Sequence, residues 1–139
     1  MLNIVNRLAL VLSGLILVGA GGTMLLAPEV LHAKNGVTLG NDPNLLSEIR
    51  APGGFLFLAG LTIAASAAQD RFVCLGLGLA ALVYSSFGVA RVYSIFVDGF
   101  PVQSLVLVTG LELGVGTLAA ILSFYSFRTD QQSNQRQQK

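Results

Sequence analysis

Apolar positions along the chain fall into four long runs that short polar segments separate. The runs cover about residues 8–27, 53–68, 72–90 and 102–127. About twenty residues of α-helix rise about 30 Å, which is the thickness of the hydrocarbon core of a bilayer. The pattern therefore predicts helices that cross a membrane, with the first over residues 8–27 and the last over residues 102–127.

The second apolar run is too short to span a bilayer by itself. Asp42 and Pro43 upstream form an N-cap followed by a proline at the first helical position. A helix from 43 to 68, kinked at Pro52, is long enough. The third helix extends in the same way to residue 97, where turn residues follow.

Tight connections join the second, third and fourth spans. Residues 68–71 (AQDR) and 98–101 (DGFP) have turn chemistry, and Asp98, Gly99 and Pro101 provide it in the second turn. The expected fold is therefore an all-α, four-helix transmembrane bundle with up-down topology. The longer connection after the first span includes PEVLHAKNG, which predicts a short interfacial helix from Pro28 to Gly36.

Basic residues favour one side of the predicted membrane domain, residues 1–127. One side holds Arg7, Arg71, Arg128, Arg136 and Lys139, and the other holds Lys34 and Arg50. Because cytoplasmic flanks carry the excess of Lys and Arg, both termini are predicted to be cytoplasmic. The polar tail, residues 128–139, is expected to be a disordered end. A cleaved signal peptide is the alternative for the first span, but its apolar core is longer than usual for one.

Composition supports a membrane protein and excludes several functions. The chain is 53% hydrophobic and 11% charged, whereas soluble domains carry roughly a quarter charged residues. The net charge of +1 gives no basis for nucleic-acid binding. A single cysteine, Cys74, excludes an internal disulfide, and with the single histidine, His32, it argues against a metal site. No cofactor motif is present, so we expect none.

Glycine is frequent within the predicted spans. Gly53 and Gly54 follow Pro52, and Gly110 and Gly114 form a GxxxG match in the fourth span. Helices in lipid associate through small residues that let their backbones approach closely. We expect these glycines to pack helices within the chain, with a dedicated dimer interface as the alternative.

Three ionisable residues lie at similar depth on three different predicted helices. Arg91 and Arg50 lie roughly 10 Å below the outer interface, and Glu112 lies roughly 15 Å below it, at 1.5 Å per residue. An unpaired charge there is unfavourable by about 2.5–3.5 kcal/mol. We therefore expect Glu112 to accept hydrogen bonds from Arg91, Arg50 or both, with Glu48 near this cluster.

The charge cluster has a structural and a functional interpretation. As a structural element, the ion pair orients the helices. As a functional element, two arginines and one glutamate leave a net positive pocket for an anion or a polar lipid head group. Catalysis ranks behind both, since one carboxylate with no nearby histidine supports no acid–base mechanism.

The same residues carry a resemblance to a known family. LLSEIRAPGG at 45–54, R…DGFP at 91–101 and LELG at 111–114 resemble the bacterial membrane family called domain of unknown function 4345. The resemblance covers nearly the whole chain before the tail. It implies a four-helix fold and a location in the membrane, and the family has no established activity to transfer.

The expected function is that of a non-enzymatic accessory or assembly subunit of a larger complex in the bacterial inner membrane. Small size, glycine-rich helix faces and the absence of catalytic motifs favour it. The alternative is a binder or carrier of a polar lipid or small anion at the Arg50, Arg91 and Glu112 cluster. The expected partners are the lipid bilayer and other membrane subunits.

Overall fold

Helices make up all the regular structure in the part of the chain that the computed structural model describes. It describes the backbone of residues 2–137 and the side chains of residues 4–128. The helices are α1 (Leu2–Leu26), α2 (Pro28–Ala33), α3 (Pro43–Ser66), α4 (Asp70–Asp98) and α5 (Gln103–Gln137). Of these, α1, α3, α4 and α5 are long and apolar enough to cross a membrane. The predicted all-α bundle with four candidate spans is confirmed.

Local sequence signals explain where these helices begin and end. Asp42 caps α3, because its carboxylate accepts from the backbone N–H of Asn44 at 2.9 Å. The α4 helix ends at Gly99, whose φ of +96° suits glycine alone among common residues. Pro28 begins α2, and Gly36 follows it with a φ of +75°. The α3 helix passes through Pro52 without interruption, and the kink expected there stays a prediction.

The last helix is longer than the sequence pattern predicted. It continues beyond the apolar run as far as Gln137, where we expected a disordered end. Residues 128–137 contain neither glycine nor proline, so nothing in that segment stops a helix already in progress. The side chains beyond Arg128 lie outside the described residues.

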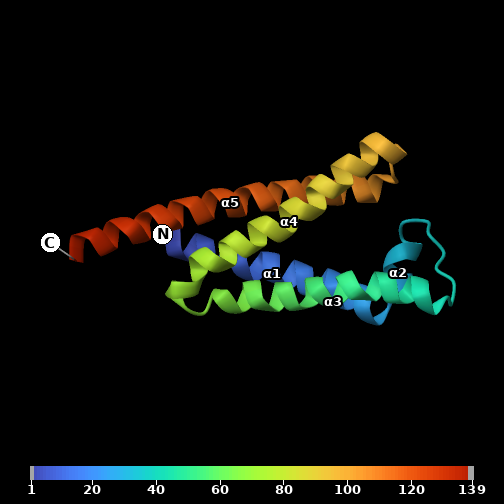
Figure 1. The fold of residues 1–139 in the computed structure, drawn as a ribbon, viewed down its shortest axis with the longest axis horizontal. Helices are drawn as coiled ribbons and strands as arrows, with labels where there is room; N and C mark the ends of the chain where they lie inside the picture. Colours follow the sequence, from blue (N-terminus) through green and yellow to red (C-terminus); the bar gives the residue numbers. More distant parts are fainter. Residues whose placement is uncertain (1, 138–139) are drawn as a thin grey trace.

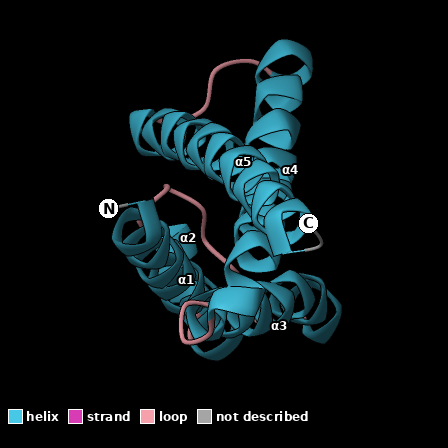
Figure 2. Cartoon of the chain, turned by 90° about the vertical axis from the view of Figure 1, so that its left-hand side faces the viewer, coloured by secondary structure: helices cyan, strands magenta, loops and turns pink. Residues whose placement is uncertain are grey.

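The long helices form two antiparallel pairs. The α1 helix packs along α3, the α4 helix packs along α5, and α4 also contacts both α1 and α3. An end-on view shows the two pairs stacked on each other (Figure 2). The α1 helix begins and the α5 helix ends at one end of the bundle, here called the terminal end (Figure 1). Toward the opposite, distal end the two pairs diverge, and α3 and α5 make no contact in the described chain.

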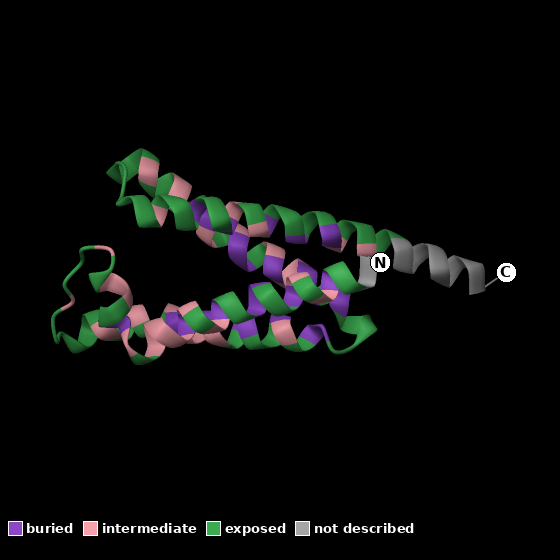
Figure 3. Ribbon diagram, turned by 180° about the vertical axis from the view of Figure 1, so that it is seen from behind, coloured by how far each residue is buried: buried purple, intermediate pink, exposed green. Residues whose placement is uncertain are grey.

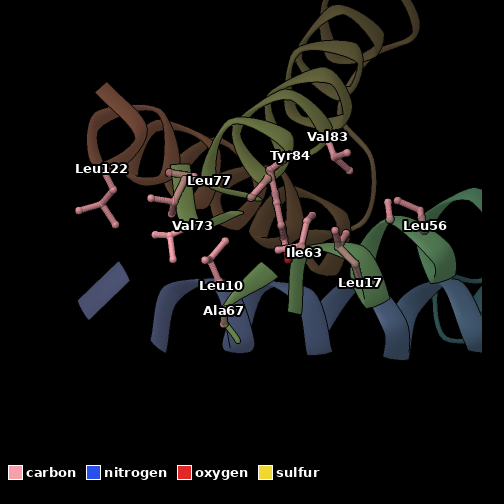
Figure 4. Close-up of a cluster of buried hydrophobic side chains, with 13 residues drawn as sticks. Leu10, Leu17, Leu56, Ile63, Ala67, Val73, Leu77, Val83, Tyr84 and Leu122 are labelled. Carbon is pink, nitrogen blue, oxygen red and sulfur yellow. The ribbon is translucent and has the colours of Figure 1, made fainter. Parts of the chain in front are cut away.

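The buried core lies where the two pairs meet. Leu10, Ile63, Leu77 and Tyr84 are at most 2% exposed, and Figure 4 shows their side chains between the helices. Only 22–39% of each apolar stretch is buried within the protein. Exposed residues run along the outward sides of the helices (Figure 3), and many of them are large and hydrophobic, for example Leu58, Leu75 and Leu82. A surface of this kind suits hydrocarbon rather than water, which supports a multi-pass membrane protein.

Candidate functional site

An ion pair joins α4 to α5 inside the bundle. The Nε atom of Arg91 donates to Oε2 of Glu112 at 3.0 Å. The Glu112 side chain is 12% exposed and that of Arg91 is 35% exposed. The two helices approach closely here because Gly88 has no side chain. A Cβ atom at that position would lie only 2.7 Å from Cδ2 of Leu113. Of the two arginines proposed as partners of Glu112, the structure therefore brings Arg91 to it.

Arg50 does not join that pair, so of the three residues in the predicted charge cluster only Arg91 and Glu112 are in contact. Arg50 is an exposed residue of α3, and α3 makes no contact with α5 in the described chain. Similar depth along the helices correctly identified Arg91 as a partner of Glu112, because α4 and α5 run side by side. It failed for Arg50 because the two helix pairs diverge toward the distal end (Figure 1). Glu48 is also exposed and makes no ion pair within the described residues.

A hollow of about 550 Å³ lies beside Arg50. Its lining residues are Asn41, Pro43, Leu46, Ser47, Arg50 and Ala51. No acidic residue lines it, and Arg50 makes neither a hydrogen bond nor an ion pair among the described residues. The expected cluster is therefore divided in the structure. Arg91 and Glu112 form an ion pair between α4 and α5, and Arg50 on α3 has no partner among the described residues.

Polar contacts between helices also occur at residues that the sequence analysis did not identify. The hydroxyl of Tyr84 donates to the backbone carbonyl of Ser13 at 2.7 Å, linking α4 to α1 in the core. At the terminal end, Asn6 donates to the hydroxyl of Ser126 at 2.8 Å. Polar side chains within apolar runs were the available signal for these contacts. Which helix each would face is not encoded in the spacing alone.

The terminal end carries a further ion pair. Arg7 donates to a carboxylate oxygen of Asp70 at 2.8 Å and also to the backbone carbonyl of Ala67. This pair fastens the start of α1 to the turn between α3 and α4. Because Asp70 is largely exposed, we regard the pair as structural and as a weak contribution to stability.

The glycines chosen from the sequence divide into two groups. A Cβ atom at Gly53 would lie 2.8 Å from Cβ of Met24, so Gly53 lets α3 approach α1. At Gly54 the nearest atom is 4.0 Å away, on Leu25. A Cβ atom at Gly110 or Gly114 would meet nothing within 4 Å. The expectation that the GxxxG pair packs helices within this chain is therefore wrong.

The turn residues lie as the sequence indicates but take no part in the ion pair. Asp98 accepts from the hydroxyl of Ser94 at 2.8 Å, one helical turn earlier. Gly99 supplies the positive φ that ends α4. Pro101 is exposed just before α5 begins. These residues direct the chain from α4 into α5, which is what brings Arg91 and Glu112 together.

Metal-ligating residues are dispersed in the described part of the chain. No group of three His, Cys, Asp or Glu side chains there is arranged to hold a metal ion. The Nδ1 atom of His32 lies 2.8 Å from the carbonyl oxygen of Pro28 within α2. The thiol of Cys74 lies 3.7 Å from the carbonyl oxygen of Ser123.

These features define a small, four-span helical membrane protein with an ion pair between its last two helices. The chain belongs to the family described as domain of unknown function (DUF4345), whose model matches residues 5–123. The family resemblance drawn from the motifs at 45–54, 91–101 and 111–114 is thereby confirmed. Comparison with curated proteins and with solved structures finds no significant match.

Proposed function

We propose that the protein is a non-enzymatic accessory or assembly subunit of a larger complex in the bacterial inner membrane. The supporting observation is the unoccupied glycine face of α5. Gly110 and Gly114 are exposed there, and an added Cβ atom at either position would have no atom of another described helix within 4 Å. Small residues at this spacing allow a second helix to approach closely in lipid.

Other glycines of the bundle show how such a face is used. A Cβ atom at Gly14 would lie 2.6 Å from the carbonyl oxygen of Gly60, and the reverse contact is equally close. Glycine within a helix is less favourable than alanine by about 1 kcal/mol, unless close packing requires it. Gly110 and Gly114 have no such close packing within the described part of the chain, so a helix of a neighbouring subunit is the occupant that we propose.

A non-enzymatic role is also our proposal. The Glu112 carboxylate is engaged by Arg91, and proton-transfer chemistry usually needs a free acid or base beside the substrate. The extramembrane segments are short, with α2 and the turns at residues 67–69 and 99–102 between the spans. Such a chain offers helix faces rather than a soluble catalytic domain.

A second candidate function is the binding of a polar lipid or a small anion. The observation that favours it is the unpaired Arg50 beside its hollow. The two candidates use different helices, α5 for the first and α3 for the second, so variants can separate them.

The subunit proposal is tested by purifying the tagged protein from its native membrane in mild detergent and identifying co-purified proteins by mass spectrometry. Gly110→Ile combined with Gly114→Ile should abolish a stoichiometric partner. Gly19→Ile is the matched control, because Gly19 is also exposed on a span with nothing within 4 Å of an added Cβ. Absence of any stoichiometric partner, or equal loss in both variants, would contradict the proposal.

A further inference from the structure

We infer that the hollow beside Arg50 is a binding site for the phosphate of a phospholipid head group. This inference rests on the second candidate function and is independent of the glycine face on α5. The site consists of the residues that line the hollow, and three of them carry hydrogen-bond donors: Asn41, Ser47 and Arg50. Below, this site is called the Arg50 hollow.

All three donors are free. The side chains of Asn41, Ser47 and Arg50 make no hydrogen bond to any described residue. Ser47 and Arg50 are three residues apart on α3, so they project from the same side of the helix. A guanidinium beside a hydroxyl and an amide matches the several acceptor oxygens of a phosphate.

The charge around the Arg50 hollow also favours an anion. Asp42 and Glu48 are the nearest acidic residues along the chain, but neither lines the hollow. The Asp42 carboxylate is engaged in capping α3. Glu48 is two residues from Arg50, a spacing at which side chains on a helix do not face each other. Arg50 is therefore left without an anionic partner among the side chains that the structure describes.

The predicted position of Arg50 in the membrane favours a lipid as the source of the phosphate. Arg50 lies seven residues after Pro43, or about 10 Å along the helix axis from the start of α3. An arginine at that depth extends its charged end to the head-group level while its stem stays in apolar surroundings. From this predicted depth the guanidinium can reach the level of the phospholipid phosphates.

The surface that adjoins the Arg50 hollow suits an acyl chain. Pro43, Leu46 and Ala51 form the apolar part of its lining. One and two turns beyond Ala51, Phe55 is 56% exposed and Leu58 is 64% exposed. These residues continue the same side of α3 at helical spacing. A lipid with its phosphate at Arg50 places its acyl chain along Phe55 and Leu58.

Native mass spectrometry of the full chain in detergent, titrated with dioleoyl phosphatidylglycerol, tests the inference. Arg50→Gln should weaken binding by about tenfold or more, the effect of losing a charge-assisted hydrogen bond. Ser47→Ala should weaken it by about threefold. Arg71→Gln is the matched control, because Arg71 is an exposed arginine at the terminal end, and its affinity should stay within about twofold of the original.

Two further titrations separate the phosphate of a lipid from other ligands. Dioleoylglycerol, which lacks the phosphate, should bind at least about tenfold more weakly than phosphatidylglycerol. Inorganic phosphate at equal concentration should not displace the lipid. Arg50→Gln binding phosphatidylglycerol as the original chain does, or dioleoylglycerol binding equally well, overturns the site. Displacement by inorganic phosphate overturns the lipid as its source.

Thermal unfolding of each variant in detergent verifies that it is folded. Arg50→Lys, which retains the charge, should recover part of the affinity that Arg50→Gln loses.

Discussion

The Nε atom of Arg91 lies 3.0 Å from Oε2 of Glu112, and this contact ties α4 to α5 within the bundle. The turn through Gly99 places the two residues beside each other, although 21 positions separate them. Glu112 is the less exposed of the two. Removing the Glu112 charge would leave Arg91 without the carboxylate that it contacts, and we therefore expect this ion pair to support the fold.

Replacing Glu112 with Gln should destabilise the protein by about 1.5–3 kcal/mol, the range for hydrogen bonds to charged groups. The arginine would then lack its anionic partner inside the bundle. The expected result is a lower yield in the membrane and a lower midpoint of thermal unfolding in detergent.

The control for that variant is Asp98→Asn. Asp98 is an exposed carboxylate at the end of α4 whose one hydrogen-bond partner among the described side chains is the hydroxyl of Ser94, so the change in stability should lie within about 0.5 kcal/mol. Combining Glu112→Gln with Arg91→Gln should recover part of the loss, since no lone charge remains. A Glu112→Gln variant as stable as the original would show that the pair does not support the fold.

Alanine at Gly60 should destabilise the bundle by about 1–3 kcal/mol, the usual range for overpacking. Its Cβ atom would lie 2.6 Å from the carbonyl oxygen of Gly14, and a backbone atom of a packed helix does not move aside easily. Gly110→Ala is the matched substitution in open space and should leave stability unchanged or slightly raised. Thermal unfolding in detergent compares them, and equal effects of the two changes would contradict the packing of α1 against α3.

Tyr84→Phe should lower the free energy of unfolding by about 0.5–1.5 kcal/mol, because it removes one buried hydrogen bond and keeps the ring. The hydroxyl donates to the carbonyl of Ser13 at 2.7 Å and the residue is 2% exposed. Tyr84→Ala should be more severe, by about 3–5 kcal/mol, since it also leaves a cavity. Reversible denaturation in detergent measures both variants. Equal losses would mean that the ring contributes nothing beyond its hydroxyl.

Orientation is tested by labelling single cysteines with a membrane-impermeant maleimide after Cys74→Ala removes the native thiol. Phe100→Cys, at a position 86% exposed in the distal turn, should react in intact cells whose outer barrier is permeable to the reagent. Ala68→Cys, exposed at the terminal end, should react only after the membrane that holds the protein is opened. The expected pattern follows from the basic residues near the terminal end, Arg7, Arg71 and Arg128. The reverse pattern would place both termini outside.

Much of the fold could be predicted from local chemistry. Asp42 and Pro43 mark the start of α3, and Gly99 marks the end of α4. Each of these signals acts within one turn of helix, so it does not depend on distant packing. Hydropathy located the four spans for a similar reason, because a segment must match the bilayer whatever its neighbours are.

The candidate site was only partly predictable. Depth along each helix follows from counting residues, and this placed Arg91 and Glu112 at levels where they meet. Depth says nothing of which helix sides face each other, and so it also grouped Arg50 with them. For the glycines the same limit applied, since Gly110 and Gly114 have the spacing of a packing motif but face away from the other helices.

The sequence alone determined a four-span helical membrane protein, its turns, its family and the positions of Arg91 and Glu112 along their helices. Tertiary structure decided that the helices pair as α1 with α3 and α4 with α5, and that these pairs diverge toward the distal end. Helix packing in lipid depends on the fit of whole helix faces, which sum many small contacts. That fit paired Arg91 with Glu112 and left Arg50 on its own beside an open hollow.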